Sequence, residues 1–376
     1  MSDQFLPVCE PTLTGNEERY ILDAVRTGWI SSSGKYVTEF EQSFAKYCGV
    51  QHGVGVCNGT VALHVALVAL GVGPGDEVII PNFTMIASAF AVCYTGAKPV
   101  FVDANPQTWN IDVNQIESKI TPRTKAIMPV HIMGLICEMP AILSIAKKYN
   151  LSVIEDAAEA HGAKLNGHRA GSFGHLSAFS FFANKNLTTG EGGMIVSNDA
   201  NLIERCRYFK NLCFPLTGGR EYQHQDIGFN YRMSNLHAAI GLAQVERADE
   251  LQNQRRQNNA LYRKLLTHVN GISFQKDDDT NYLHAHWMNA ILVDEKLYGM
   301  NRDSLMQHLH QNGIDSRKLF TGMHKQKSLE KYGCNINRDF SVSEHLANNG
   351  LYLPSSSHLT NDQIERVCEV IKKAVK

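Results

Sequence analysis

The segment Phe179-Ser180-Phe181-Phe182-Ala183-Asn184-Lys185-Asn186-Leu187-Thr188-Thr189-Gly190-Glu191-Gly192-Gly193 places a lysine between a strand-like apolar run and a glycine-rich turn. A second strand-like run, residues 194–197, follows the glycines. A lysine on a tight, partly buried turn can lose its proton and act as an amine nucleophile toward a carbonyl. Most lysines in such loops are simply exposed, and the glycines can equally form a hairpin between two strands. Taken alone, the segment leaves both interpretations open.

A carboxylate, Asp156, directly follows another apolar run, residues 151–155. Open α/β sheets bind ligands at the carboxyl ends of their strands, and alternation along the strand points Glu155 and Asp156 to opposite sides. A carboxylate that a parallel sheet brings close to Lys185 is what a pyridinium nitrogen needs. The pair therefore suggests a Schiff-base lysine and the acidic partner of pyridoxal phosphate, with a helix cap and a solvated charge pair as the alternative.

Asn58-Gly59-Thr60 follows a strand-like run and precedes a predicted helix. Free backbone N–H groups, a hydroxyl donor and the helix dipole make such a position suitable for a phosphate. A simple N-cap by Asn58 or Thr60 is the alternative. Further along, Asn230 and Arg232 precede a long helix, where a cap with a surface cation would also fit. The order of these elements along the chain, rather than any one of them, favours the cofactor interpretation.

The first two-thirds of the chain alternate strand-like and helical patterns, with glycines at helix ends. This alternation predicts an α/β fold with a large, mostly parallel sheet that is covered on both faces. The predicted strands are residues 77–81, 98–102, 125–131, 151–155, 177–182 and 194–197. The predicted helices are residues 62–70, 85–94, 141–149 and 201–210.

One long helix, residues 235–266, is predicted to connect two domains. We expect a large domain over residues 1–250 and a smaller α+β domain over residues 251–376. The smaller domain is expected to hold a strand at 287–293, a helix at 302–311 and a final helix. That final helix opens with the capping box Thr360-Asn361-Asp362-Gln363.

Composition excludes several classes of protein. The 376 residues carry a net charge of −1 with no basic tract, so we expect no nucleic-acid partner. Apolar stretches are too short to span a bilayer, so no membrane association is expected. The nine cysteines have irregular spacing and no zinc-site pattern, which indicates reduced thiols in a cytoplasmic protein and no metal.

The sequence resembles the DegT/DnrJ/EryC1/StrS family of pyridoxal-phosphate sugar aminotransferases, from Pro11 to the last helix. The residues that carry the resemblance are Asn58-Gly59-Thr60-Val61-Ala62-Leu63-His64, Glu155-Asp156-Ala157-Ala158-Glu159-Ala160, the lysine segment with Met194, and Gly228-Phe229-Asn230-Tyr231-Arg232-Met233. Within the family, Trp29-Ile30-Ser31-Ser32 and Ser180–Lys185 are most similar to the GDP-perosamine synthases, which aminate C4 of a GDP-4-keto-6-deoxymannose.

The resemblance implies the aspartate aminotransferase-like fold type I and a homodimer with shared active sites. It also implies a reaction in which glutamate donates the amino group to the 4-keto carbon of a nucleotide-linked 4-keto-6-deoxy sugar, for surface-polysaccharide or glycan biosynthesis. Amination at C3, a dTDP- or UDP-linked sugar, a dehydratase on the same cofactor and a non-catalytic regulator are the alternatives. Family dehydratases carry histidine in place of the lysine, so Lys185 argues against that reaction.

Roles for individual residues also follow from the resemblance. Lys185 is expected to form the Schiff base and move the substrate proton, and Asp156 to keep the pyridine nitrogen protonated. The other expected cofactor contacts are Asn58, Gly59, Thr60, Met85, Glu159, Ser180 and, from the other subunit, Asn230. The expected sugar contacts are Trp29, Arg317 and His324.

Several positions depart from the pattern of the related enzymes, and three of them are Met85, Lys318 and Met133. Met85 replaces the aromatic residue that stacks on the cofactor ring, and a thioether packs on a π face more weakly. Lys318 replaces the proline after Arg317, and Met133 replaces a tyrosine. These changes fall around the expected sugar pocket, so the sequence leaves the nucleotide and the sugar open.

Overall fold

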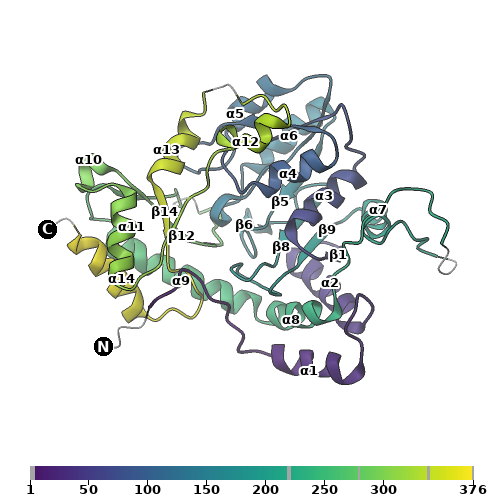
Figure 1. The fold of residues 1–376 in the computed structure, drawn as a ribbon, viewed down its shortest axis with the longest axis horizontal. Helices are drawn as coiled ribbons and strands as arrows, with labels where there is room; N and C mark the ends of the chain where they lie inside the picture. Colours follow the sequence, from purple (N-terminus) through teal and green to yellow (C-terminus); the bar gives the residue numbers. More distant parts are fainter. Residues whose placement is uncertain (1–4, 218–221, 278–279, 337–338, 375–376) are drawn as a thin grey trace.

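The computed structural model describes residues 5–217, 222–277, 280–336 and 339–374. A seven-stranded sheet of order β1-β9-β8-β5-β4-β2-β3 lies at its centre (Figure 1). β9 runs antiparallel to both of its neighbours, and the remaining neighbouring pairs are parallel. The strands are β1 (His52–Val56), β9 (Gly193–Ser197), β8 (Leu176–Ser180), β5 (Ser152–Asp156), β4 (Thr124–Ile127), β2 (Glu77–Pro81) and β3 (Lys98–Val102).

Helices cover both faces of this sheet because its strands are apolar on both sides. Ile79 of β2 belongs to one core, whereas its neighbours Val78 and Ile80 belong to the core on the opposite face. The first core is closed by α1 (Glu17–Thr27), α2 (Lys35–Cys48), α6 (Met139–Tyr149) and α8 (Asn235–Glu246). The second is closed by α3 (Gly59–Ala69), α4 (Ala87–Tyr94) and α7 (Ala200–Lys210).

The C-terminal part builds a four-stranded antiparallel sheet of order β10-β12-β14-β13 with its own core. Its elements are α9 (Ala248–Leu266), β10 (Ile272–Phe274), β12 (Asn289–Val293), α10 (Glu295–Tyr298), α11 (Arg302–Gln311), β13 (Arg317–Lys318), α13 (Ser341–Asn349), β14 (Gly350–Leu353) and α14 (Asn361–Lys373). Leu6 joins this core and pairs with Ile314, so the first described residues pack with the C-terminal part.

Short elements complete the chain. β6 (Lys164–Leu165), β7 (His168–Arg169) and β11 (Tyr282–Leu283) form a three-stranded sheet. The remaining helices are α5 (Val113–Ile116), α12 (Lys327–Lys331), η1 (Glu117–Lys119), η2 (Ile132–Gly134) and η3 (Met323–Lys325).

The predicted α/β class is confirmed, and most predicted elements lie within two residues of those observed. The single long helix is wrong, because it breaks at Arg247 into α8 and α9. The strand expected at 125–131 ends at Ile127, since the chain turns into η2 soon afterwards. The capping box at Thr360 is present. The division into domains at residue 250 stays a prediction.

Candidate active site

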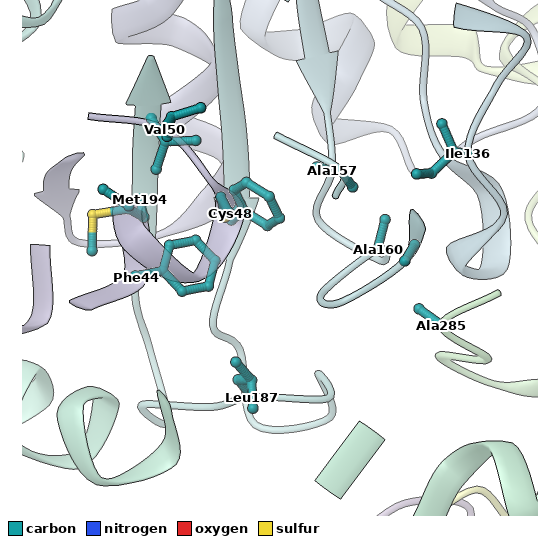
Figure 2. Packing of buried hydrophobic residues seen from close by; sticks show 14 of the residues in the cluster. Phe44, Cys48, Val50, Ile136, Ala157, Ala160, Leu187, Met194 and Ala285 are labelled. Atoms are coloured by element: carbon teal, nitrogen blue, oxygen red, sulfur yellow. The ribbon is translucent and has the colours of Figure 1, made fainter. Parts of the chain in front are cut away.

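Lys185 lies on the loop that joins the antiparallel strands β8 and β9. The segment is therefore both a connection between two paired strands and the carrier of the lysine. The Lys185 backbone N–H donates to Phe182 O at 2.9 Å, which closes a tight turn. Leu187, two residues further on, is buried in the first core (Figure 2). Thr188 anchors the loop again, because its hydroxyl donates to Phe181 O at 3.0 Å. These contacts fix the segment that carries the lysine.

Two buried carboxylates lie at the carboxyl end of β5, where Lys185 is found. Asp156 ends the strand and Glu159 follows in the next turn. Burial lowers the pKa of Lys185 from its ordinary value, although the charges of Glu159 and Asp156 oppose this shift. The Lys185 residue as a whole is only partly buried, so part of its surface remains open to solvent. A lysine with a lowered pKa is a nucleophile and a proton carrier.

The pKa values of both carboxyl groups are raised because burial disfavours their charged forms. For Glu159 the pKa rises to about 7, even though Lys185 and the backbone N–H of Met133 favour its charge. That N–H donates to Glu159 Oε2 at 2.7 Å. For Asp156, the Ser88 hydroxyl donates to Oδ2 at 2.7 Å and counteracts the effect of burial.

Glu155 points away from this site, as the alternation along the strand predicts. Its carboxylate accepts hydrogen bonds from Ser177 Oγ at 2.7 Å and from Gly174 N at 2.8 Å, and it pairs with His131 Nε2 at 3.0 Å. Burial would raise its pKa, but these partners outweigh burial and lower it. The residue therefore has a structural part in holding the loop between β5 and β8.

The N-terminus of α3 lies against Ser180, the last residue of β8. Asn58 Oδ1 caps the helix by accepting from Val61 N at 3.0 Å. Within the described residues, the backbone N–H groups of Gly59 and Thr60 and the Thr60 hydroxyl have no hydrogen-bond partner. A Cβ on Gly59 would lie 2.6 Å from Cβ of Ser180, so only glycine allows this approach. The donors and the helix dipole suit an anion.

These residues fit pyridoxal phosphate. Unpaired donors at the start of α3 suit its phosphate, and the buried carboxyl group of Asp156 suits its ring nitrogen. Lys185 would supply an amine of the kind that reacts with the cofactor's aldehyde. Within the described parts of the chain, no group of acidic, histidine and cysteine side chains could hold a metal ion. None of the helices described is long and apolar enough to cross a membrane.

One wall of the site consists of residues that the sequence did not single out. Trp287 lies under the lysine, with Lys185 Nζ 3.8 Å from the ring centroid. Tyr352 lies beside Trp287, with ring centroids 6.2 Å apart, and its pKa is raised to about 12 mainly by burial. The sequence does not identify Ser88 either. No sequence pattern marks a serine near the start of a helix as the hydrogen-bond partner of a carboxylate at the end of a strand. No local pattern identifies these residues, since they come from distant segments.

The remaining predicted residues lie further out or are engaged within this chain. Asn230 and Met85 are exposed, and the described residues directly after α7 extend away from the body (Figure 1). Trp29 is 58% exposed. Arg317 is also exposed and pairs with Asp315 at 3.0 Å. These four side chains are thus open to solvent in the single chain, and their predicted contacts stay predictions.

His324 is buried, and both of its ring nitrogens are engaged within the chain. Nδ1 lies 2.8 Å from Asn82 Nδ2, and Nε2 lies 3.0 Å from Glu344 Oε1. Phe340 stacks on the ring. This arrangement leaves no free ring nitrogen for a sugar, and it makes His324 a link between β2 and α13. Lys318 likewise faces Asp303, at 3.1 Å, and Met133 is buried.

Comparisons with known proteins agree with this geometry. The model of the DegT/DnrJ/EryC1/StrS aminotransferase family matches residues 11–372. GDP-perosamine synthase of Escherichia coli O157:H7 is 44% identical over 371 residues, covering 98% of each chain. GDP-perosamine synthase of Caulobacter vibrioides is 44% identical over 370 residues, again covering 98% of each. The solved structure of S. venezuelae DesV has a TM-score of 0.91 at 31% identity and covers 99% of both chains.

The expected aminotransferase activity, the cofactor pyridoxal phosphate and the fold type I architecture are thus confirmed. The match spans nearly the whole chain and includes the lysine loop, the β5 carboxylates and the start of α3. The chain therefore belongs to the DegT/DnrJ/EryC1/StrS aminotransferase family.

Proposed function

We propose that the enzyme moves an amino group from glutamate to the 4-keto carbon of a GDP-linked 4-keto-6-deoxy sugar. The proposal rests on the names of the relatives that are 44% identical over almost the full length. The observation that carries the chemistry is the amine of Lys185, whose pKa is lowered by burial, beside the buried carboxyl groups of Asp156 and Glu159. An amine with a lowered pKa in such surroundings can both attack a carbonyl and relay protons.

Each group in the site has a part in this proposal. Bound pyridoxal phosphate supplies the electron sink that stabilises negative charge on the substrate carbon. Lys185 Nζ takes the proton from the donor carbon and later delivers one to the sugar carbon. Asp156 holds a proton on the ring nitrogen, and Ser88 orients its carboxylate. Gly59, Thr60 and Ser180 bind the phosphate at the start of α3, and Glu159 lies beside the ring.

The proposed enzyme is a cytoplasmic homodimer whose active sites are shared between subunits. Exposed large apolar side chains support this assembly, because burying them against a second subunit removes apolar surface from water. Val25, Trp29, Ile30, Leu216 and Ile227 are between 48% and 90% exposed. Asn230, which pairs with Asn211 directly after α7, would then reach the phosphate of the partner, and Trp29 and Arg317 would contact the sugar.

One experiment tests the activity directly. The purified protein is incubated with glutamate and with GDP-, dTDP- and UDP-linked 4-keto-6-deoxy sugars, and products are identified by mass and NMR. We expect 2-oxoglutarate and a GDP-linked 4-amino sugar, with no turnover by Lys185→Ala. A product aminated at C3 would contradict the proposed position of amination, and a preference for another nucleotide would contradict the proposed GDP-linked substrate. A fully active Lys185→Ala variant would show that Lys185 takes no part in the reaction.

Mixing two inactive variants tests the shared site. Lys185→Ala lacks the reactive amine, and Asn230→Asp places a negative charge where the partner's phosphate is expected. If sites are shared, co-refolded mixtures contain hybrid dimers with one intact site and regain up to about a quarter of the activity. A mixture no more active than its components would place Asn230 outside the partner's site.

A further inference from the structure

We propose that Trp287 is a positioning residue for Lys185, which it holds by two separate parts of one indole side chain. The proposal rests on the proposed function, because it concerns the amine that moves protons in transamination. The ring face of Trp287 lies below the amine, and its edge binds the backbone next to the lysine. Together these contacts fix both the chain that carries the amine and the amine itself.

The contact with the amine is direct. Lys185 Nζ lies 3.8 Å from the centroid of the Trp287 ring, well within the range at which a cation is attracted to an aromatic face. The indole Nε1–H donates to Asn184 O at 3.0 Å. Asn184 immediately precedes Lys185, so this bond fixes the peptide that starts the lysine residue. Phenylalanine would keep a ring face but lose this donor.

Trp287 is itself held firmly and is only 4% exposed. Its backbone N–H donates to Met133 O at 2.9 Å, in the segment that also binds Glu159. Its carbonyl accepts a 2.6 Å hydrogen bond from Arg255 Nη1. Phe320 stacks on the ring, with an interplanar angle of 12°. A side chain held by all these contacts provides a rigid surface on which the flexible lysine side chain can pack.

An aromatic face attracts the ammonium form of lysine and not the neutral amine. Burial acts in the opposite direction, because it favours the neutral form. Trp287 therefore holds the Lys185 amine in place while the amine is charged. This is the interval after the amine accepts a proton and before it releases one. The other ionisable groups around the amine are Asp156, Glu159, Cys9, Arg255 and His161.

Two variants separate the two contacts. Trp287→Phe keeps a ring under the amine and removes the Nε1–H donor, whereas Trp287→Leu removes both. The rate of the glutamate half-reaction is measured by stopped-flow, together with exchange of the glutamate α-hydrogen in D2O. We expect the rate to fall by about two- to thirtyfold in Trp287→Leu, the range of one cation–π contact. The fall should be smaller in Trp287→Phe, with KM for glutamate unchanged in both.

A second readout needs neither substrate nor cofactor. The indole fluorescence of the cofactor-free protein is titrated with base, because loss of the proton from a contacting ammonium changes its emission. We expect a transition below the ordinary lysine value of 10.5, absent in Lys185→Met and retained in Trp109→Phe, which removes a buried tryptophan elsewhere. A purely structural role for Trp287 would lower thermal stability and cofactor retention without this titration.

The outcomes separate the two proposals. If the wild-type protein shows the titration but no transamination, the proposed function fails and the contact stands. If Trp287→Leu retains the wild-type half-reaction rate, or if Lys185→Met leaves the fluorescence titration unchanged, Trp287 does not position the lysine.

Discussion

Ser88 Oγ donates a 2.7 Å hydrogen bond to Oδ2 of Asp156, from a helix on one face of the sheet to the end of its middle strand. Burial raises the pKa of Asp156, and among the groups that oppose this shift the Ser88 hydroxyl has the largest effect in favour of the charged carboxylate. We predict that Ser88→Ala weakens cofactor binding by roughly tenfold or more, since bonds to charged groups contribute about 1.5–3 kcal/mol. Absorbance titration of the cofactor-free protein measures this. Thr84→Val, which removes only a neighbour of Ser88, should have a smaller effect.

The close approach of Gly59 to Ser180 predicts a strong effect of a single methyl group. Gly59→Ala places a Cβ 2.6 Å from Ser180 Cβ, so the start of α3 must move away from β8. We expect the cofactor to be lost on dialysis from this variant, while the fold is retained. Gly73→Ala is the matched control, because a Cβ there meets nothing within 4 Å. Equal cofactor retention in both variants would contradict the assignment of the phosphate site.

The raised pKa of Glu159 predicts that this residue destabilises the cofactor-free protein at neutral and higher pH. Its folded-state pKa is about 7 against an ordinary 4.5, so the folded protein holds the proton more tightly than the unfolded chain. Stability is therefore lost as pH rises from 4.5 to 7. Glu159→Gln should gain about 1–3 kcal/mol near pH 8 and little near pH 4. Urea unfolding measures both, with Glu117→Gln on the surface as control.

His161 predicts the opposite dependence on pH. The ring is 1% exposed, neither nitrogen has a partner among the described residues, and Phe44, Phe179 and Phe181 surround it. Burial lowers its pKa from 6.5 to about 3, so stability is complete above 6.5 and is lost as pH falls toward 3.

His161→Phe should remove this loss, which amounts to about 1.4 kcal/mol per pH unit at most. Thermal unfolding of the variant between about pH 4 and pH 7 should show a flatter curve than that of the wild type. His268→Gln, at an exposed position, should leave the wild-type curve unchanged. An equally steep curve in His161→Phe would show that this ring does not titrate on unfolding.

Much of the large sheet could be predicted because its signals are local. Apolar runs such as residues 77–81 and 98–102 match β2 and β3 residue for residue. Strand alternation also separates Glu155 from Asp156 correctly, since the period of a strand depends on nothing distant. The break at Arg247 could not be predicted because both sides are good helical sequence, and no residue pattern marks the non-helical backbone of Arg247, with φ −113° and ψ 13°.

The walls of the site could not be predicted for the same reason. Trp287 and Tyr352 lie more than 100 residues after Lys185, and neither belongs to a pattern with a chemical meaning. The partners of His324 could not be predicted either. The family resemblance predicts a sugar contact, which stays a prediction, while Asn82 and Glu344 lie within hydrogen-bond distance of its two ring nitrogens. Tertiary partners, which no linear pattern contains, decide what such a residue can do.

The pairing of Val56 with Gly193 has a consequence for how this enzyme can change. The strand before the α3 N-terminus and the strand after the lysine loop are locked in one register, and a one-residue slip would turn every side chain to the other face. Insertions within β1, β8 or β9 should therefore abolish activity. New substrates can thus be acquired by changing the segments around a fixed reaction centre.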